Sequence, residues 1–388
     1  MKFLQLYPFY DQFLSSCYRS DTSLRCCEYD EQLMRILQYG FGAHHLLVPQ
    51  LDKYGYETEI VIPNCFTLQM QWAEEHGIDI TDDDIQDKRW VYDIAKQQIE
   101  YFKPDILLIQ QPVVFDSSFI RTLKWEPLLI MGSHGSDIPS TTDWSSFDMI
   151  LSGLTRLREQ ALKLGAKSVR EFMPGFPLWI MSHLDGIKKE KDVVFLGNWT
   201  EFQHEKRNRY IEYIVQYIKS NNYPFSCSLY MGGDIATIPS NVSESNYGNR
   251  FGIDMYKTMC AGKIVFDGRG SIRLLDGENT YDLACNETAN IRIFEAAGSG
   301  AFLLTEYHDN LNNYFKVGEE IETYANKDEL IKKIHFYLDH PDERDTIAQQ
   351  GQKRCHKDHS MKERARQFDV YVKEYMKQGK KTLVTSSN

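Results

Sequence analysis

The sequence predicts an α/β protein made of two similar halves, each a parallel β-sheet with helices on both faces. Three observations support this fold class. The chain has 388 residues, a length typical of two domains. In both halves, short apolar runs alternate with segments of helical length, which is the pattern of parallel strands joined by helical crossovers. A Pro- and Gly-containing break at 174–177 and a charged piece at 188–191 interrupt this pattern, and we expect the domain hinge between them.

The first half contains six expected strands. Ligands of parallel sheets bind beyond the carboxyl ends of the strands, so the loops after Leu6, Ile62, Ile109 and Met131 should share one rim. No element is predicted for the polar stretch 15–30, and the acidic run 82–84 is expected on a loop. The expected strands are 2–7, 57–62, 105–110, 128–131, 148–152 and 168–172, and the expected helices are 31–54 (with Gly40 and Gly42 as breaks), 68–76, 87–102, 115–123 and 155–164.

The second half is organised around residues 287–304. An amphipathic helix is expected over 289–298, a turn at 299–300, and a buried parallel strand over the apolar run 301–305. The remaining strands are expected at 192–196, 225–230 and 263–266, and the remaining helices at 205–220, 249–260, 327–338, 342–356 and 361–377.

Two carboxylates, Glu287 and Glu295, flank the start of this helix with seven residues between them. Positions eight apart on a helix lie about 80° out of alignment, from the helical period. The two side chains can therefore share a site most easily if Glu287 lies on the loop before the helix.

Charge and cysteine content exclude several classes of protein. The net charge is −11, from 44 basic and 55 acidic residues, which argues against nucleic acid or an anionic membrane as a general partner. The eight cysteines show no zinc-finger spacing and suit reduced thiols in a cytoplasmic enzyme. We expect no integral membrane segment, because no window approaches an uninterrupted apolar span. The oligomeric state is left open.

Common phosphate-binding and hydrolase motifs are missing. No Gly-x-Gly-x-x-Gly follows the first strand, so a dinucleotide site is not predicted. The sequence also lacks a P-loop Gly-Lys-Ser/Thr and the Gly-x-Ser-x-Gly elbow of hydrolases. The chemistry must therefore come from other residues.

An ordered series of short motifs runs from residue 290 to residue 365. The series resembles the C-terminal nucleotide-binding half of GT-B glycosyltransferases, and within these it is most similar to the CgeB-like (spore-maturation-type) enzymes. The resemblance covers about a quarter of the chain, and the spacing of the two glutamates also resembles the motif of retaining GT-B enzymes. The matching elements are Arg292-x-Phe294-Glu295-Ala296, Gly300-x-x-Leu303-Leu304-Thr305, Phe315-x-x-Gly318-Glu319-Glu320, Glu329-Leu330, Pro341-x-x-Arg344, Gly351 and His359.

The resemblance implies two Rossmann-like doubly wound domains that face each other across a cleft. It implies an acceptor-binding domain over 1–178, a nucleotide-sugar donor-binding domain over 190–358, a helix over 359–378 that crosses back to the first domain, and a flexible tail over 379–388. The expected enzyme is a glycosyltransferase of glycan or surface-polysaccharide biosynthesis. It would move a sugar from a nucleotide-diphosphate sugar, with UDP or GDP as the nucleotide, to an acceptor hydroxyl.

No cofactor or metal is expected, because Arg and Lys side chains and a helix N-terminus would replace a metal. The glutamate pair implies retention of the anomeric configuration. Two alternatives stay open. One is a nucleotide-sugar epimerase of the same fold, and the other is a non-catalytic nucleotide-sugar-binding protein.

Four residues around the helix start are candidate donor ligands. By the resemblance, Glu295 would accept hydrogen bonds from the ribose hydroxyls, but it could instead form a surface ion pair with Arg292, three residues earlier. Glu287 would be catalytic, near the sugar or the diphosphate, or else only a charge at the helix N-terminus. Asn290 and Arg292 could bind the diphosphate, with a plain N-cap as the alternative for Asn290.

Further donor-side candidates lie nearby in the expected fold. Gly197 and Asn198 end the first strand of the second domain. Lys206 and Arg207 begin its next helix. One of these two cations could neutralise the leaving diphosphate, or both could belong to a solvated charge run. Two glycines, 298 and 300, would be small either to admit the nucleotide or to cap the helix.

The first domain supplies acceptor-side candidates. His134 lies in a Gly/Ser loop at the carboxyl end of a strand and is the candidate catalytic base or sugar ligand, with a plain turn histidine as the alternative. Asn64 and Gln69 follow the second strand, where an acceptor would bind. In the second domain, His308 follows the strand that ends at Thr305 and is a further candidate near the donor.

Overall fold

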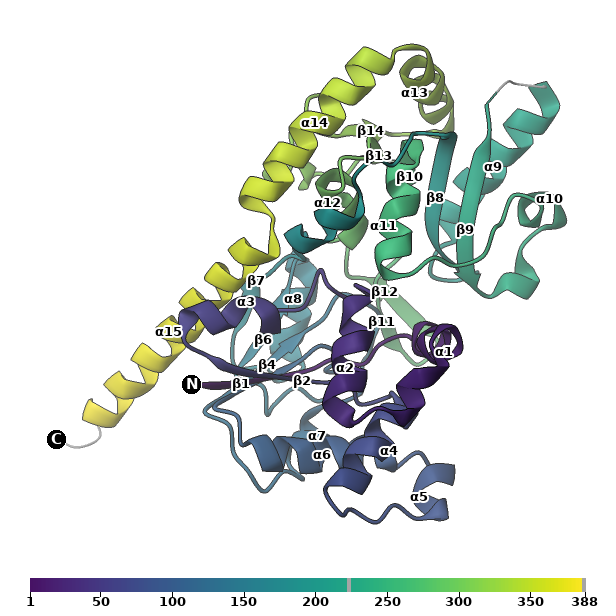
Figure 1. The fold of residues 1–388 in the computed structure, drawn as a ribbon. Coiled ribbons are helices and arrows are strands. Elements are labelled where there is room, and N and C mark those ends of the chain that lie inside the picture. Colours follow the sequence, from purple (N-terminus) through teal and green to yellow (C-terminus); the bar gives the residue numbers. More distant parts are fainter. Residues whose placement is uncertain (222–224, 386–388) are drawn as a thin grey trace. The chain divides into compact units, whose positions relative to one another are not determined.

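The computed structural model describes residues 1–221 and 225–385. The chain divides into two compact units (Figure 1). Unit 1 comprises Met1–Met173, Leu275–Glu278 and the chain from Met361, and unit 2 comprises Pro174–Leu274 and Asn279–Ser360. The assignment of acceptor binding to 1–178 and of donor binding to 190–358 stays a prediction.

Unit 1 is built on a parallel six-stranded sheet. Its strands are β1 (Lys2–Leu6), β2 (Glu57–Val61), β3 (Ile106–Ile109), β4 (Leu129–Ser133), β6 (Met149–Ser152) and β7 (Val169–Glu171), in the order β2-β1-β3-β4-β6-β7. A two-residue strand, β5 (Ile138–Pro139), lies outside this sheet. The helices are α1 (Asp11–Ser20), α2 (Tyr29–Gln38), α3 (Val48–Leu51), α4 (Phe66–Glu75), α5 (Asp82–Gln86), α6 (Trp90–Phe102), α7 (Ser117–Ile120), α8 (Thr155–Lys163) and α15 (Met361–Thr385).

The carboxyl ends of β1 to β4 lie at one edge of this sheet. Leu6 is in register with both Val61 and Ile109, and Ile109 is in register with Gly132. The prediction that the loops after these strands share one rim is therefore confirmed.

Helix α15 supplies part of the unit 1 core. It lies along α3 (Figure 1), and Phe368 packs edge-on against Phe3 with ring centroids 5.3 Å apart. The buried Tyr56 hydroxyl donates to Asp369 (2.9 Å). The helix extends to Thr385, so the predicted tail 379–388 begins inside it, and the last three residues lie outside the described part.

Two local predictions in unit 1 were wrong, and the expected breaks at Gly40 and Gly42 were confirmed. Helix α1 was missed, although its buried residues have helical spacing. The expected helix 31–54 breaks after α2, where Gly40 and Gly42 adopt positive φ angles of 76° and 69°, and resumes only at α3. The acidic run 82–84 is not a loop but the first turn of α5, because Thr81 and Asp84 form a capping box.

Unit 2 is built on a second parallel sheet, of five strands. Its strands are β8 (Lys191–Trp199), β9 (Cys227–Gly233), β10 (Gly262–Asp267), β13 (Leu303–Glu306) and β14 (Glu322–Tyr324), in the order β14-β13-β10-β8-β9. The helices are α9 (Glu205–Asn221), α10 (Ser240–Ser243), α11 (Gly252–Cys260), α12 (Ile291–Gly298), α13 (Lys327–Asp339) and α14 (Pro341–Asp358).

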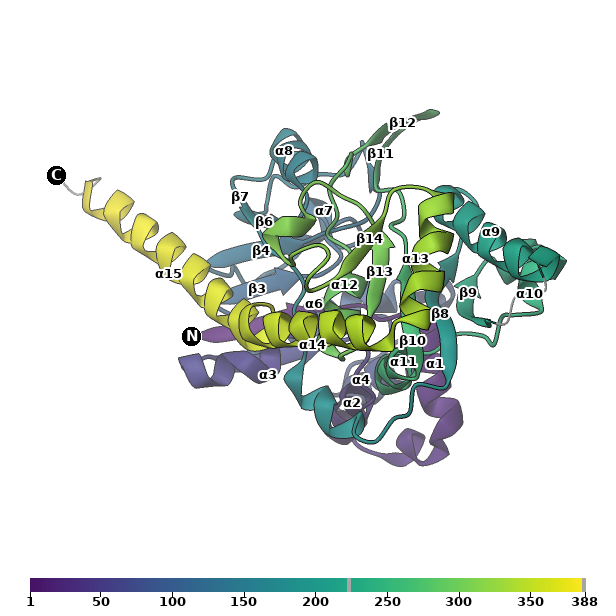
Figure 2. The same cartoon turned by 90° about the horizontal axis from the view of Figure 1, so that it is seen from above.

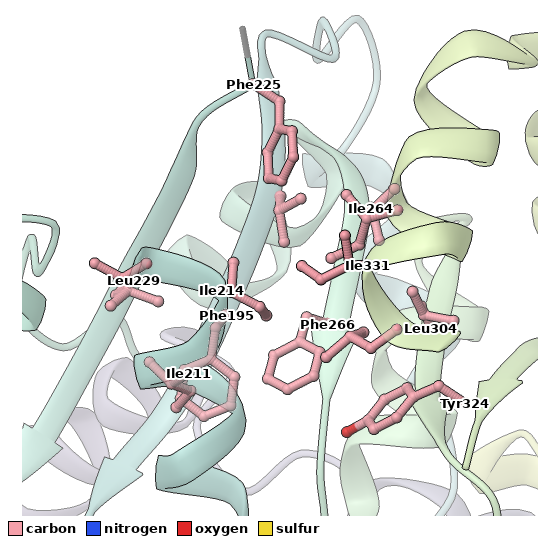
Figure 3. Packing of buried hydrophobic residues seen from close by; sticks show 14 of the residues in the cluster. Phe195, Ile211, Ile214, Phe225, Leu229, Ile264, Phe266, Leu304, Tyr324 and Ile331 are labelled. Atoms are coloured by element: carbon pink, nitrogen blue, oxygen red, sulfur yellow. The ribbon is translucent and has the colours of Figure 1, made fainter. Parts of the chain in front are cut away.

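Alternate strand residues of unit 2 face a large apolar core. Phe195 and Phe266 of the sheet meet Ile211 of α9 and Ile331 of α13 (Figure 3). Helices α9 and α13 lie side by side (Figure 2). Burial on both sides of the strands is the reason why they appear in the sequence as short apolar runs.

A β-hairpin that the sequence analysis did not predict lies between β10 and α12. Its strands are β11 (Arg273–Asp276) and β12 (Asn279–Asp282). The turn of the hairpin belongs to unit 1, where the Ser140 N–H donates to the Leu275 carbonyl oxygen (2.7 Å).

Candidate functional site

Polar side chains of unit 2 gather where its strands end. Asp267 is the last residue of β10 and is in register with Thr305 of β13, which in turn is in register with Thr323 of β14. Helix α12 begins at this edge, because the Asn290 amide nitrogen donates to both oxygens of Asp267 (2.9 and 3.1 Å). The expected order of helix, turn and strand over 289–305 is confirmed.

Asp267 connects several elements of this edge. Its carboxylate is buried and also accepts a hydrogen bond from the Thr305 hydroxyl (3.1 Å), and its carbonyl oxygen accepts one from Tyr324 (2.8 Å). Burial raises the pKa of Asp267, and the positive charges of Arg292 and Arg207 oppose that rise. This residue was not predicted from the sequence, where its only local signal is an acidic side chain directly after a buried apolar run.

Arg292 and Glu295 form a buried ion pair. The guanidinium donates to Glu295 Oε2 (2.8 Å) and to the Leu196 carbonyl oxygen (3.3 Å). Only 1% of the Glu295 side chain and 12% of the Arg292 side chain are exposed. The alternative of an ion pair with Arg292 is thus correct, but its placement on the helix surface is wrong. The Tyr256 side chain lies beside Glu295, and burial first, then this carboxylate, raises the pKa of Tyr256.

Asn290 is the N-cap of α12. Its side-chain oxygen accepts a hydrogen bond from the Arg292 backbone N–H (3.2 Å) while its amide nitrogen holds Asp267. Both ends of the side chain therefore make internal contacts in this structure. The predicted binding of a diphosphate by Asn290 and Arg292 stays a prediction.

The two cations that begin α9 differ in exposure. Lys206 is 66% exposed and pairs with the buried carboxylate of Glu306. Arg207 is buried, donates to the Asn198 carbonyl oxygen, and lies over the Phe195 ring, 5.1 Å from its centroid. Burial lowers the pKa of Arg207 to about 10. The alternative of a solvated charge run therefore does not hold for Arg207.

Gly197 lies in β8 beside these groups. A Cβ added to it would lie 3.0 Å from the Phe195 ring and 3.6 Å from the Arg207 guanidinium. The tight contact is with the Phe195 ring, whereas the distance to the Arg207 guanidinium is an ordinary van der Waals contact.

Glu287 lies on the loop before α12, as expected. Arg269 holds this loop, because its guanidinium donates to the carbonyl oxygens of Glu287 and Cys285 (2.9 Å to the latter). The side chain of Asn310 brackets the same loop: it accepts from the Thr288 N–H (2.9 Å) and donates to the Thr288 carbonyl oxygen (2.8 Å). Arg269 was not predicted from the sequence.

Packing explains the small side chain of Gly298, and a positive φ explains that of Gly300. A Cβ on Gly298 would lie 2.3 Å from ring atoms of Phe176, and a Cβ on Gly300 would lie 2.7 Å from the Gln352 amide. Gly300 has a φ of 79°, whereas Gly298 is the last helical residue and has no positive φ. The idea that Gly298 caps the helix is therefore wrong, and the left-handed residue is Gly300.

His134 of unit 1 lies just beyond β4, as predicted. Its ring is buried, with Nε2 3.3 Å from both the Asp137 carbonyl oxygen and the Ser136 hydroxyl, and it packs edge-on against Trp144. Burial lowers the pKa of His134 to about 4, so the imidazole is neutral at pH 7. A neutral imidazole can accept a proton or hydrogen-bond a sugar hydroxyl.

The two other unit 1 candidates make contacts within unit 1. Asn64 bridges to the loop after β1, accepting from the Phe9 N–H (3.0 Å) and donating to the Phe9 carbonyl oxygen (2.6 Å) and to Asp11 (2.8 Å). Gln69 is fully buried and donates to the Ile62 carbonyl oxygen (3.0 Å). Both residues therefore shape the rim from within, and their contact with an acceptor stays a prediction.

The described residues contain neither a cluster of metal-ligating side chains nor a membrane-spanning helix. No group of three or more His, Cys, Asp and Glu side chains that could hold a metal ion was found within 1–221 and 225–385. Over the same ranges, no helix is long and apolar enough to cross a membrane.

The comparison with protein families places a match on the second half of the chain. Residues 230–369 match the model of a family described as glycosyl transferase-like. This segment contains Asp267, Arg269, Glu287 and the whole of α12. No curated protein sequence matches the chain.

Several solved structures share the fold along nearly the whole chain. A glycosyltransferase from Rickettsia africae is 12% identical, with a TM-score of 0.58 over 97% of this chain and 98% of that one. The Anabaena protein Alr3699/HepE, in complex with UDP and glucose, is 12% identical, with a TM-score of 0.57 over 96% of this chain and all of that one. A sucrose-phosphate synthase from Thermosynechococcus elongatus is 9% identical, with a TM-score of 0.55 over 97% of this chain and all of that one.

The predicted fold class, a GT-B arrangement of two parallel α/β sheets, is confirmed by these structures. The family match over residues 230–369 confirms the predicted enzyme class, a glycosyltransferase.

Proposed function

We propose that this glycosyltransferase moves a sugar from a nucleoside-diphosphate sugar, bound at the carboxyl edge of the unit 2 sheet, to an acceptor hydroxyl. The network of Asp267, Arg292 and Glu295 at that edge carries the proposal. Ionised groups are costly to bury, and clusters of them beyond the ends of parallel strands are typical of ligand sites. All three residues lie in the segment that matches the glycosyl transferase-like family.

The chemistry follows from the residues at this edge. The acceptor oxygen forms a bond to the anomeric carbon while the bond from that carbon to the phosphate oxygen breaks. The electron pair stays on the diphosphate, and the acceptor proton passes to a phosphate oxygen. Cations at the edge, such as Lys206, would stabilise the leaving charge in place of a metal, and no cofactor is required.

We assign Glu295 to the ribose hydroxyls, Glu287 to the transferred sugar, and His134 to the acceptor side, with Asn64 and Gln69 supporting the rim that binds the acceptor. The glutamate pair favours retention of configuration. The motif series favours the CgeB-like subfamily, and a glycan or surface polysaccharide as the product.

The test is the melting temperature of the protein with UDP, GDP, CDP, dTDP and ADP. UDP comes first, because the Anabaena structure of the same fold contains it. A nucleotide present at 100 times its Kd stabilises the folded state by about 2.7 kcal/mol. We expect one nucleotide to raise the melting temperature, and a smaller rise in Glu295→Gln, measured against that variant's own ligand-free value.

The absence of a shift with every nucleotide, for a folded protein, would overturn the donor site. If a nucleotide binds, incubation of its sugar derivatives decides among the alternatives. Conversion of the sugar without an acceptor would indicate an epimerase, and binding without any turnover would indicate a non-catalytic binding protein.

A further inference from the structure

His308 is a buried histidine whose ring nitrogens have no hydrogen-bond partner within the described residues. The side chain is only 3% exposed, and both Nδ1 and Nε2 are buried and unbonded over 1–221 and 225–385. Unbonded polar atoms are rare in protein interiors, because a buried donor or acceptor without a partner costs about 1–3 kcal/mol. The ring therefore has hydrogen-bonding capacity that the ligand-free protein does not use.

The loop that carries His308 is well held. It follows β13, so the ring lies at the same sheet edge as Asp267. The Leu311 N–H donates to the His308 carbonyl oxygen (3.1 Å), and the Asp309 N–H donates to the Asn286 carbonyl oxygen (2.9 Å). These bonds hold the backbone at His308, and within the described residues the ring nitrogens form no hydrogen bonds of their own.

Two cations act on the His308 ring. Burial is the main cause that lowers the pKa of His308 to about 3, and the charges of Arg269 and then Lys206 lower it further, while Asp309 opposes them. The guanidinium of Arg269 is held by carbonyl oxygens of the 285–287 loop, and Lys206 is held by Glu306. The surroundings of the ring therefore favour a negatively charged ligand.

A neutral imidazole that offers one N–H beside two cations complements a phosphate group. Phosphate oxygens accept hydrogen bonds and carry the charge that Arg269 and Lys206 would attract. A nucleobase or a sugar hydroxyl would use the N–H but not the positive charge. Lys206 is mostly exposed, so its side chain can turn from Glu306 towards such a ligand.

We propose that His308 is a donor-binding residue whose ring N–H donates a hydrogen bond to the diphosphate of the nucleotide sugar, between Arg269 and Lys206. This inference rests on the proposed function of unit 2. The imidazole supplies a hydrogen bond that strengthens as charge accumulates on the departing phosphate, while the two cations supply the attraction.

The test compares His308→Leu, His308→Gln and the wild type. Titration calorimetry measures the Kd of UDP, GDP, CDP, dTDP and ADP, and of the nucleoside that corresponds to the best of them. A hydrogen bond to a charged group corresponds to roughly 10- to 100-fold in affinity. We expect His308→Leu to lower the affinity for the nucleoside diphosphate by that factor, and His308→Gln to lower it less. Both variants should bind the nucleoside with unchanged affinity.

The ligand-free melting temperature is the second readout. Because the ring makes no hydrogen bond to any residue that the structure describes, His308→Leu should melt at or above the wild-type temperature. The matched control is His335→Leu in α13, where the ring contacts the Tyr217 hydroxyl (3.2 Å). This variant should melt lower and bind the nucleotide as the wild type does.

The outcomes separate the two levels of the proposal. A wild-type protein that binds none of the five nucleotides overturns the donor site and this inference with it. A wild type that binds, together with an equal Kd for His308→Leu, overturns the role of His308 and leaves the donor site intact. An equal loss of affinity for the nucleoside would show that the ring does not contact the phosphates, and would likewise overturn it.

Discussion

Removing the carboxylate of Glu295 should destabilise α12 strongly, because the Arg292 guanidinium would be left buried without its partner. The two side chains are 2.8 Å apart and almost fully buried. Two unit charges at 4 Å interact by about 4 kcal/mol at an effective dielectric constant of 20, and loss of one partner of a buried pair costs about 3–5 kcal/mol. In this variant Arg292 keeps its hydrogen bond to the Leu196 carbonyl oxygen and the attraction of Asp267. We therefore expect Glu295→Gln to lower the free energy of unfolding by about 3 kcal/mol.

Urea unfolding gives the free energy of unfolding for the wild type, Glu295→Gln, Arg292→Met and the double variant. Hydrogen exchange of peptides from α12 then shows whether the loss is local to that helix. The double variant should cost less than the sum of the single variants by about 2 kcal/mol, since it leaves no unpaired charge.

An exposed pair with the same spacing is the matched control. Lys316 and Glu319 are three residues apart, 3.4 Å between charged atoms, and 68% and 62% exposed. Glu319→Gln should cost less than about 1 kcal/mol. If Glu295→Gln costs no more than Glu319→Gln, the buried pair does not stabilise α12 and the reasoning is refuted.

Three further results are expected. Gly298→Ala should lower the free energy of unfolding in urea by about 1–3 kcal/mol, because its Cβ would overlap the Phe176 ring. The control Gly135→Ala, whose Cβ meets no atom within 4 Å, should change it by less than about 0.5 kcal/mol. Equal losses in the two variants would contradict the packing role of Gly298. The pKa of about 4 for His134 lies below the value of about 6.5 in an unfolded chain. The contribution of His134 to the free energy of unfolding is therefore complete above pH 6.5, and it falls by up to about 1.4 kcal/mol per pH unit down to pH 4. His134→Gln should flatten the pH dependence of unfolding in that range, and an unchanged slope would count against it. Asp267→Asn should lower the free energy of unfolding by about 1–3 kcal/mol, because an oxygen that accepts from the Asn290 amide is replaced by a donor. A loss below about 0.5 kcal/mol would show that this contact does not stabilise the fold.

The sequence was informative wherever a feature depends on neighbouring residues. The helical period of 291–298, the small residues that follow and the apolar run to Thr305 predicted α12, the turn and β13. The alternation of strands and helices predicted parallel sheets and the shared rim of β1 to β4. Where the local pattern was weaker, as in α1 and at 82–84, the predictions were wrong.

Contacts between distant residues were not predictable in the same way. Asp267 meets Asn290 and Thr305, which are 23 and 38 residues away in the sequence, and Arg269 meets the Glu287 carbonyl oxygen across 18 residues. No local pattern distinguishes these two residues from other acids and bases that follow a strand, so both were missed.

The sequence by itself therefore determined the class of elements, their order and the edge of each sheet where polar residues gather, because these follow from periodicity and from the direction of the strands. Only the tertiary structure decided which polar side chains are buried. It placed Glu295 inside rather than on the helix surface and gave Gly298 a packing role through Phe176. It also left the His308 ring nitrogens without a hydrogen-bond partner in the described part of the chain. Burial depends on which distant segments come to cover a residue, and the residue's neighbours in the sequence do not contain that information.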